Sequence, residues 1–215
     1  STQDTINPGV VPNAEDGTVD INWKLEEKSS DQLELSAGWG GGVGLTGTLG
    51  VTFNNFSIKN IMKKSSWDPL PTGDGQKLSL RYQSNGRAYR SMNFSFTEPW
   101  LGGKKRNSLT IGINNSKYSN AFDPYTGTID RKRSDSNYLK TTGLSVSLGK
   151  QLKWPDDFFY IQGRFKYQYN NVIEGQNYYT EGVSNQFSVG ALISRRNIDN
   201  PVFPSAGSSL MLDIE

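Results

Sequence analysis

The most suggestive spacing in the chain is Gly42-Val43-Gly44-Leu45-Thr46-Gly47, which spells G-x-G-x-x-G. That fingerprint binds a dinucleotide where a strand turns sharply into a helix whose N-terminus faces the pyrophosphate. Here the glycines run into an alternating strand, so we predict no bound nucleotide and no cofactor. Glycine inside a strand weakens it and permits bending or close backbone approach. The glycines between 38 and 50 therefore indicate either simple tolerance of curvature or a first hairpin that can open.

Three acidic residues share one long polar segment and raise the question of a calcium site. Asp123, Asp130 and Asp135 have a spacing that fits no standard calcium loop, and three basic residues occupy 131–133 among them. A solvated loop is therefore favoured, and no metal site is predicted.

A second charged set comprises Glu34, Arg81, Arg164 and Lys166, all on the polar sides of predicted strands. These residues could be read as an acid and base set. Ion pairs inside a barrel are the ordinary explanation, and no nucleophile accompanies them. We therefore expect structural ion pairs here rather than catalysis.

The composition removes several classes of function. The chain of 215 residues has no cysteine and no histidine, which excludes disulfides, thiolate chemistry, imidazole metal sites and Ser-His-Asp catalysis. Its formal net charge is +2, so no strong basic field attracts nucleic acid. We expect a protein that is not an enzyme and has no nucleic-acid partner.

The elements that hold these residues are strands with a strict period of two. In 43–54, apolar residues at 43, 45, 49, 51 and 53 share one face, whereas Thr and Asn share the other. The same alternation predicts nine strands, at 32–40, 43–54, 77–84, 88–97, 108–118, 142–150, 159–169, 185–194 and 208–215.

The alternation predicts a transmembrane antiparallel β-barrel whose apolar face meets lipid. No run of about 18 apolar residues exists to form a spanning helix, whereas a barrel strand needs only about 9–11 residues. A soluble β-sandwich or lipocalin-like barrel also alternates, but its wet face usually carries many Lys and Glu. Here that face is mostly Ser, Thr, Gly and Asn, which favours the membrane barrel.

Strand counting sorts the connections into two ends. Segments 99–107, 152–157 and 195–207 fall at one end, with 55–76, which we expect to include a short amphipathic turn on the membrane surface. Segments 85–87, 119–141 and 170–184 fall at the other end and are predicted to be extracellular loops. Residues 1–17 are predicted to be loop and 18–26 one amphipathic strand. Aromatic residues at strand ends suggest membrane-interface girdles: Trp39, Phe53, Trp100, Tyr118 and Trp154.

Four segments resemble the BamA family of outer-membrane protein assembly factors. Residues 26–40 (EEKSSDQLELSAGWG) are similar to the junction between the last periplasmic POTRA domain and the first barrel strand. Residues 53–56 (FNNF), 94–103 (FSFTEPWLGG) and 199–208 (DNPVFPSAGS) resemble further family signatures, in the family's order. The last two are periplasmic turns in the family, and their matching residues include Thr97, Glu98, Pro99, Trp100, Leu101, Gly102, Phe203, Pro204 and Gly207.

The resemblance implies a sixteen-stranded outer-membrane barrel, of which this chain supplies about nine strands. Residues 1–30 would be the end of the last POTRA domain and a hinge, lying in the periplasm. Residues 31–215 would be the N-terminal half of the barrel. The segment 55–76 is similar to an insert of Bacteroidota forms. An unclosed sheet leaves backbone groups unpaired in lipid, so we expect this piece to be inactive alone.

The resemblance also implies a function, the folding and insertion of client outer-membrane proteins at the first-strand seam. Expected partners are those clients, outer-membrane lipoprotein subunits of the assembly complex, the lipid bilayer and, through the extracellular loops, surface-exposed proteins. A passive pore or transporter and a structural surface barrel are the alternatives. We expect the client-pairing edge to comprise Gln32, Leu33, Glu34, Leu35, Ser36, Ala37, Gly38, Trp39 and Gly40, held by main-chain hydrogen bonds.

Overall fold

The chain contains two compact units, Ser1–Ser30 and Asp31–Glu215. A computed structural model describes residues 9–13, 17–22, 31–40, 44–67, 69–103, 107–119, 122–123, 125–173, 181–200 and 202–215. Among these residues, no helix is long and apolar enough to cross a bilayer.

The first unit contains a β-hairpin. Strand β1 (Gly9–Asn13) pairs antiparallel with β2 (Thr18–Asn22), with Val10 opposite Ile21. The expectation that 1–17 is entirely loop is therefore wrong for 9–13. Pro12 suggested loop because it lacks an N–H, but a two-stranded hairpin has free edges that tolerate this loss. The predicted strand 18–26 is observed over 18–22, and 23–26 lie outside the described residues. Assignment of this unit to a POTRA domain stays a prediction.

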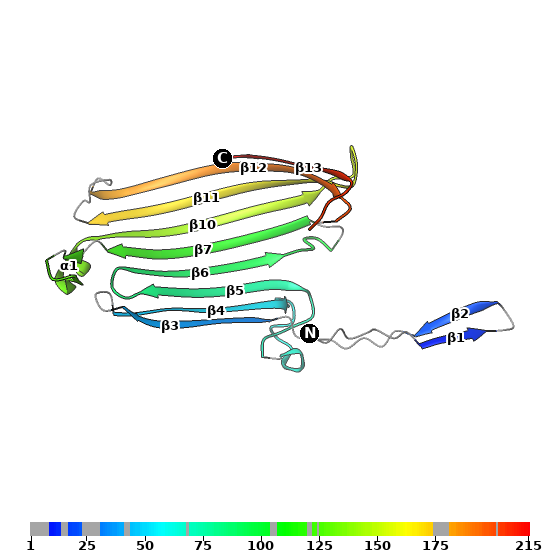
Figure 1. The fold of residues 1–215 in the computed structure, drawn as a ribbon, viewed down its shortest axis with the longest axis horizontal. Helices are drawn as coiled ribbons and strands as arrows, with labels where there is room; N and C mark the ends of the chain where they lie inside the picture. Colours follow the sequence, from blue (N-terminus) through cyan, green and yellow to red (C-terminus); the bar gives the residue numbers. More distant parts are fainter. Residues whose placement is uncertain are drawn as a thin grey trace. The chain divides into compact units, whose positions relative to one another are not determined.

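The second unit contains one nine-stranded antiparallel sheet in which each strand pairs with the next along the chain (Figure 1). The predicted all-β fold and all nine predicted strands are confirmed. In chain order the strands are β3 (Gln32–Gly40), β4 (Gly44–Phe56), β5 (Gln76–Asn85), β6 (Tyr89–Glu98), β7 (Asn107–Ser119), β10 (Tyr138–Gln151), β11 (Phe159–Ile173), β12 (Gly182–Ile198) and β13 (Gly207–Ile214).

Several strands are longer than their alternating segments. Strand β11 continues to Ile173 and β12 begins at Gly182, so the predicted loop 170–184 is shorter than expected. Backbone pairing continues there between residues such as Asn171 and Val183. The ladder depends on backbone groups, so it persists where side-chain alternation has already faded.

The register aligns apolar residues into a row that crosses eight strands. Each neighbouring pair in this row is directly opposed: Leu33, Val51, Leu80, Phe94, Ile113, Leu144, Tyr167 and Phe187. One position along, on the other face, the row is polar or small: Gln32, Thr52, Ser79, Ser95, Gly112, Ser145, Lys166 and Ser188. One face of the sheet is thus apolar and the other polar, as a membrane barrel requires.

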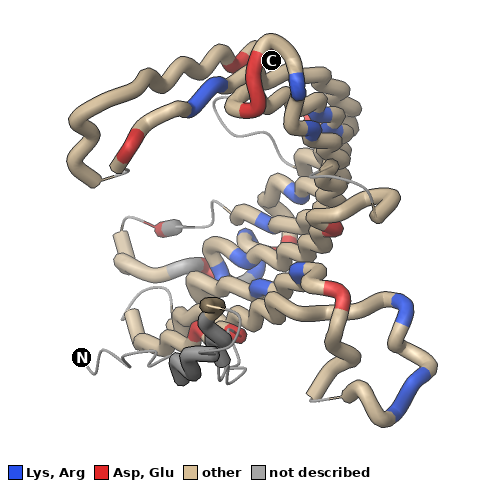
Figure 2. Tube along the Cα trace, turned by 90° about the vertical axis from the view of Figure 1, so that its right-hand side faces the viewer, with Lys and Arg blue, Asp and Glu red and all other residues tan. Residues whose placement is uncertain are grey.

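The apolar face is exposed rather than packed into a protein core. Among the described residues, the buried hydrophobic side chains are Phe56 and Val172, whereas Leu33, Phe187 and many others in the apolar rows are exposed. So large an apolar surface marks a face that meets lipid or another protein. Charged residues are spread over strands and connections in the view along the strands (Figure 2).

The connection between β4 and β5 is an ordered loop. It contains the 3₁₀ turn η1 (Lys64–Ser66), and Ser57 donates its backbone N–H to the carbonyl of Pro71 at 2.8 Å. Ile58, Met62 and Trp67 remain exposed, which agrees with the predicted apolar surface of this loop. Its placement against a membrane stays a prediction.

The connection between β7 and β10 contains more structure than the predicted loop 119–141. It includes β8 (Phe122–Asp123), β9 (Thr128–Ile129) and the short helix α1 (Arg131–Ser136). Tyr118, expected in a lipid-facing girdle, shares the polar face with Ser116 because side chains alternate along β7. That expectation is therefore wrong for Tyr118, whereas Trp39 and Trp154 are strongly exposed.

Candidate functional site: the first-strand edge and the two turn motifs

Strand β3 lies at one edge of the nine-stranded sheet. Residues 32–40 pair with 44–52 of β4, and among the described residues no strand pairs with the other side of β3. Leu33, Leu35 and Trp39 are 71%, 74% and 78% exposed on the apolar face. All residues of the predicted client-pairing edge therefore lie on a strand with one free backbone edge, a template for a further strand.

The backbones of β3 and β4 approach closely at Gly47. A Cβ atom placed on Gly47 would lie 2.5 Å from the carbonyl oxygen of Ser36, which is too close for any side chain. Beside it, the N–H of Thr48 donates to Ser36 Oγ at 3.0 Å. A side-chain acceptor thus supplements the backbone ladder in the middle of β3.

The two ends of β3 are held differently. At its start, the N–H of Asn54 donates to Asp31 Oδ1 at 3.0 Å. Further along the strand, the Glu34 side chain extends over Gly50 toward β5. Its Oε1 lies 3.0 Å from Nη2 of Arg81. Both groups are about half exposed, so this ion pair contributes little to stability. Side-chain contacts thus support the first half and the middle of β3, whereas the backbone ladder with β4 continues to Gly40.

The four charged residues singled out in the sequence do not form one set. Glu34 pairs with Arg81 as an ion pair on the polar face, as predicted. Arg164 instead binds Asp213, with Nη1 and Oδ2 3.1 Å apart, and Lys166 Nζ lies 2.5 Å from Glu215 Oε1. The sequence reasoning missed these two carboxylates: Asp213 is on β13 and Glu215 directly follows it, and both reach across β12 to the basic residues of β11.

The first turn motif, 97–102, is connected to the β4–β5 loop through a buried side chain. Gln76 is 1% exposed, accepts the N–H of Ile58 on Oε1 at 2.8 Å and donates Nε2 to Glu98 Oε2 at 2.7 Å. The other oxygen of Glu98 accepts the N–H of Trp100 at 2.9 Å. Glu98 therefore orders its own turn and the neighbouring loop together. The sequence showed Glu98 in the motif but gave no signal for Gln76.

The remaining residues of this motif close the turn. Thr97 Oγ1 lies 3.1 Å from Thr110 Oγ1 on the paired strand β7. Leu101 donates its N–H to the carbonyl of Asn107 at 2.8 Å, and Gly102 has a φ of 80°, which favours glycine. Pro99 lies between these contacts, where no ladder N–H is required.

The second turn motif, 199–208, is ordered by two side chains. Asp199 Oδ1 accepts the N–H groups of Ser205 and Ala206 at 3.0 and 3.1 Å, and its Oδ2 accepts the Ser205 hydroxyl. Asn200 Oδ1 accepts the N–H of Phe203 at 3.3 Å. Phe203 is 80% exposed, so the turn presents an apolar side chain outward. Pro204 and Gly207 complete the bend into β13, with Gly207 at a φ of 104°.

These contacts surround the Asp199 carboxylate with hydrogen-bond donors. The Ser205 hydroxyl, followed by backbone N–H groups, holds the pKa of Asp199 well below its ordinary value. The carboxylate is therefore charged in the folded turn over the whole physiological range.

The glycine fingerprint and the three aspartates, for which no nucleotide or metal site was predicted, have structural roles in the fold. Gly44–Phe56 is one strand, so the glycine fingerprint is not followed by a helix; Gly42 and Val43 lie outside the described residues. Asp130 caps α1 by accepting the N–H of Lys132 at 2.8 Å, and Asp135 lies 3.9 Å from Lys117 Nζ. Asp123 accepts the N–H of Tyr125 at 2.9 Å. The three carboxylates thus hold different parts of the loop.

Comparisons with known proteins agree with this architecture. The family model of the Omp85 superfamily domain matches residues 72–215. The outer membrane protein assembly factor BamA of Neisseria meningitidis serogroup B is 30% identical over 131 residues, 60% of this chain and 13% of that protein.

Among solved structures, BamA from Haemophilus ducreyi lacking POTRA domains 1–3 has a similar fold. Its TM-score is 0.50 at 22% identity, and the match covers 98% of this chain and 38% of that chain. The chain therefore spans well under half the length of each of these two relatives.

Proposed function

The chain belongs to the Omp85 superfamily, and we propose that it is part of an outer-membrane protein that folds and inserts other β-barrels. The relative in Neisseria meningitidis is named as an outer-membrane protein assembly factor. The proposed partners are client outer-membrane proteins, lipoprotein subunits of an assembly complex and the bilayer. The protein would act without an enzymatic step, through backbone pairing.

The observation that carries this proposal is the exposed apolar alternation of β3 together with its position as an outer strand of the described sheet. A strand added there would gain main-chain hydrogen bonds without a strict sequence requirement, as in β-augmentation. Leu33, Leu35 and Trp39 are exposed on the apolar face, so an added strand with the same alternation would extend the lipid-facing surface. Client recognition would then depend on alternation and backbone, not on particular side chains.

The direct test is in-cell photocrosslinking from positions 33–39 of the full-length protein. Crosslinks to nascent outer-membrane proteins are expected if β3 is the pairing edge. Crosslinks only to the protein's own last strand, even under client overload, would contradict the proposal and favour a closed pore or a structural barrel.

A paired substitution separates the backbone of β3 from its side chains. The Ser36 carbonyl, and with it the Ser36 N–H, faces β4, so the N–H of Ala37 lies on the free side of β3. Ala37→Pro removes that N–H, whereas Ala37→Val keeps it with a side chain of similar size. We expect the proline variant to impair client insertion more than the valine variant, at equal protein levels in the outer membrane. Equal effects would argue against backbone templating. Deletions within 119–141 and 170–184 that spare insertion would separate this role from a structural or adhesive one.

A further inference from the structure

Three cationic residues are directly opposed on neighbouring strands near the α1 end of the sheet. Arg90 of β6 faces Lys117 of β7, and Lys117 faces Lys140 of β10. Like charges at directly opposed positions destabilise a sheet unless an anion lies between them. We call Arg90, Lys117 and Lys140 the cationic row.

The cationic row lies on the apolar face of the sheet. Arg90 is four residues before Phe94, and Lys140 is four residues before Leu144, so in each strand they share a face. The row one position along, on the other face, is Tyr89, Tyr118 and Leu139. The polarity of the two faces is thus reversed at this level relative to the middle of the sheet.

The spacing of residues along β10 places the cationic row at one border of the apolar band, the stretch of the apolar face that would contact lipid. Lys140 and Lys150 flank Leu144, Val146 and Leu148 on the same face. Ten residues rise about 34 Å at about 3.4 Å per residue. With a strand tilt of about 35–45° this corresponds to roughly 26 Å, close to the apolar height of such barrels. Lys140 is then at the depth of lipid headgroups.

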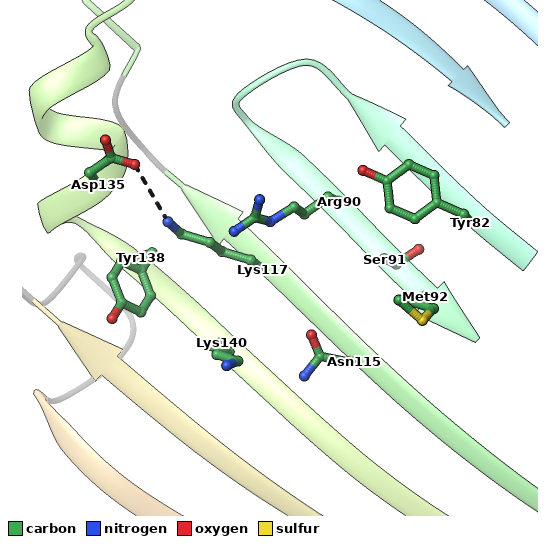
Figure 3. Close-up of a pocket in the computed structure, with 9 residues that line it drawn as sticks. All are labelled: Tyr82, Arg90, Ser91, Met92, Asn115, Lys117, Asp135, Tyr138 and Lys140. Atoms are coloured by element: carbon green, nitrogen blue, oxygen red, sulfur yellow. Dashed lines mark ion pairs between the residues drawn. The ribbon is translucent and has the colours of Figure 1, made fainter. Parts of the chain in front are cut away.

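The cationic row lines an open pocket with mixed walls (Figure 3). The pocket has a volume of about 470 Å³, and Tyr82, Met92 and Tyr138 line it together with the three cations. A smaller pocket beside it is lined by Arg87 as well as Arg90 and Lys117. Aromatic and thioether walls beside clustered cations suit a ligand that has an apolar part and a negative head.

Among the described residues, the cationic row forms an ion pair with one carboxylate, that of Asp135. Asp135 lies 3.9 Å from Lys117 Nζ and is 76% exposed, and Lys117 also lies over the Tyr138 ring at 4.3 Å from its centre. Within the described segments, Arg90 and Lys140 form no ion pair. One exposed carboxylate leaves the row with a net positive charge, which an external anion can neutralise.

We propose that the cationic row binds the phosphate headgroup of a membrane lipid in the leaflet on the α1 side. The headgroup lies between Arg90, Lys117 and Lys140, and the acyl chains follow the apolar face past Met92 and Phe94. Arg and Lys are the usual phosphate ligands, and each cation near an anionic surface strengthens binding. This site depends on the barrel spanning a bilayer, as the proposed function does, but not on client insertion.

The test is native mass spectrometry of the full-length protein in detergent with phosphatidic acid or phosphatidylcholine added. Wild-type protein is expected to retain phosphatidic acid preferentially. The variant Arg90→Gln/Lys117→Gln/Lys140→Gln should lose at least about tenfold in retention, since each cation near the surface contributes about fivefold. The matched control, Lys77→Gln/Arg81→Gln/Lys166→Gln, removes three cations from the polar face and should retain it like wild type.

A second variant changes binding in the opposite direction. Asp135→Asn removes the carboxylate beside Lys117 and should increase retention of phosphatidic acid. The proposal is wrong if wild type shows no preference between the two lipids, or if the triple variant and its control behave alike. Displacement of the lipid by an equal concentration of inorganic phosphate would instead indicate a free-anion site. Client insertion by the triple variant, measured in parallel, reports on the proposed function separately.

Discussion

Asp199 shows how one side chain orders a whole turn of the sheet. Its carboxylate receives hydrogen bonds from the Ser205 hydroxyl and from the N–H groups of Ala206, Ser205 and Asn200. These donors favour the charged form, which is why the pKa of Asp199 is lowered from 3.8. The fold of this turn is therefore linked to the protonation of a single residue.

This linkage predicts a loss of local order in acid. Because the folded pKa is lower than the unfolded one, the stabilisation is complete above the ordinary value of 3.8 and is lost as pH falls through the folded value. Hydrogen-exchange protection of the Ser205 and Ala206 amides should drop over that interval. In Asp199→Asn the drop should be absent. A pH-independent wild type would contradict the assignment.

Gly47 is the residue at which β3 and β4 have no room for a side chain. Gly47→Ala should push the two backbones apart and increase hydrogen exchange of the β3 amides by tenfold or more, a cost of about 1–3 kcal/mol typical of overpacking. Gly163→Ala in β11 is the matched control, since a Cβ there meets no atom within 4 Å. Similar exchange in the two variants would show that the close approach at Gly47 has no energetic consequence.

At the scale of elements, Gln76 joins the β4–β5 loop to the turn between β6 and β7. Gln76→Ala would leave Glu98 Oε2 and the Ile58 N–H without their Gln76 partner and should lower the free energy of local opening of 56–76 by about 1–3 kcal/mol. Gln83→Ala, on the same strand and half-buried, is the control. Hydrogen exchange across 56–76 and 98–103 measures the effect. Opening confined to the loop alone would show that Glu98 does not couple the two segments.

Strand positions and faces were predictable from the sequence because both follow from a period of two. Val51, Leu80 and Phe94 alternate with polar residues, so their shared face is fixed before the register is known. The turn network of Gln76 and Glu98 was not predictable, since it joins residues from separate hairpins. The strand at 9–13 was missed because Pro12, which lacks a backbone N–H, suggested a loop. The cationic row was not predictable either, because its three members are far apart in the sequence and only the strand register places them opposite one another.

At the scale of the molecule, the apolar band defines how the sheet meets its surroundings. Ile113 lies in the middle row, Asn115 two residues nearer the band's edge and Asn114 on the polar face. Ile113→Lys should cost about 2–4 kcal/mol in the folding of the full-length barrel into bilayers, whereas Asn115→Lys should cost about 0–1 kcal/mol. Asn114→Lys controls for the added charge. Urea titration of the three variants in lipid vesicles gives the free energies, and equal costs would mean that this face does not contact hydrocarbon.

The alternation along β3 has a consequence for any strand that joins it. A partner displaced by one residue would turn its polar side chains toward Leu33, Leu35 and Trp39, whereas a partner displaced by two would match again. Pairing at this edge is therefore unfavourable at odd offsets and equally favourable at each even offset. A joining strand can advance along β3 only in steps of two residues, about 7 Å each. Pairing with β3 alone would not fix which of these even offsets the joining strand adopts, so contacts outside β3 would set its final position.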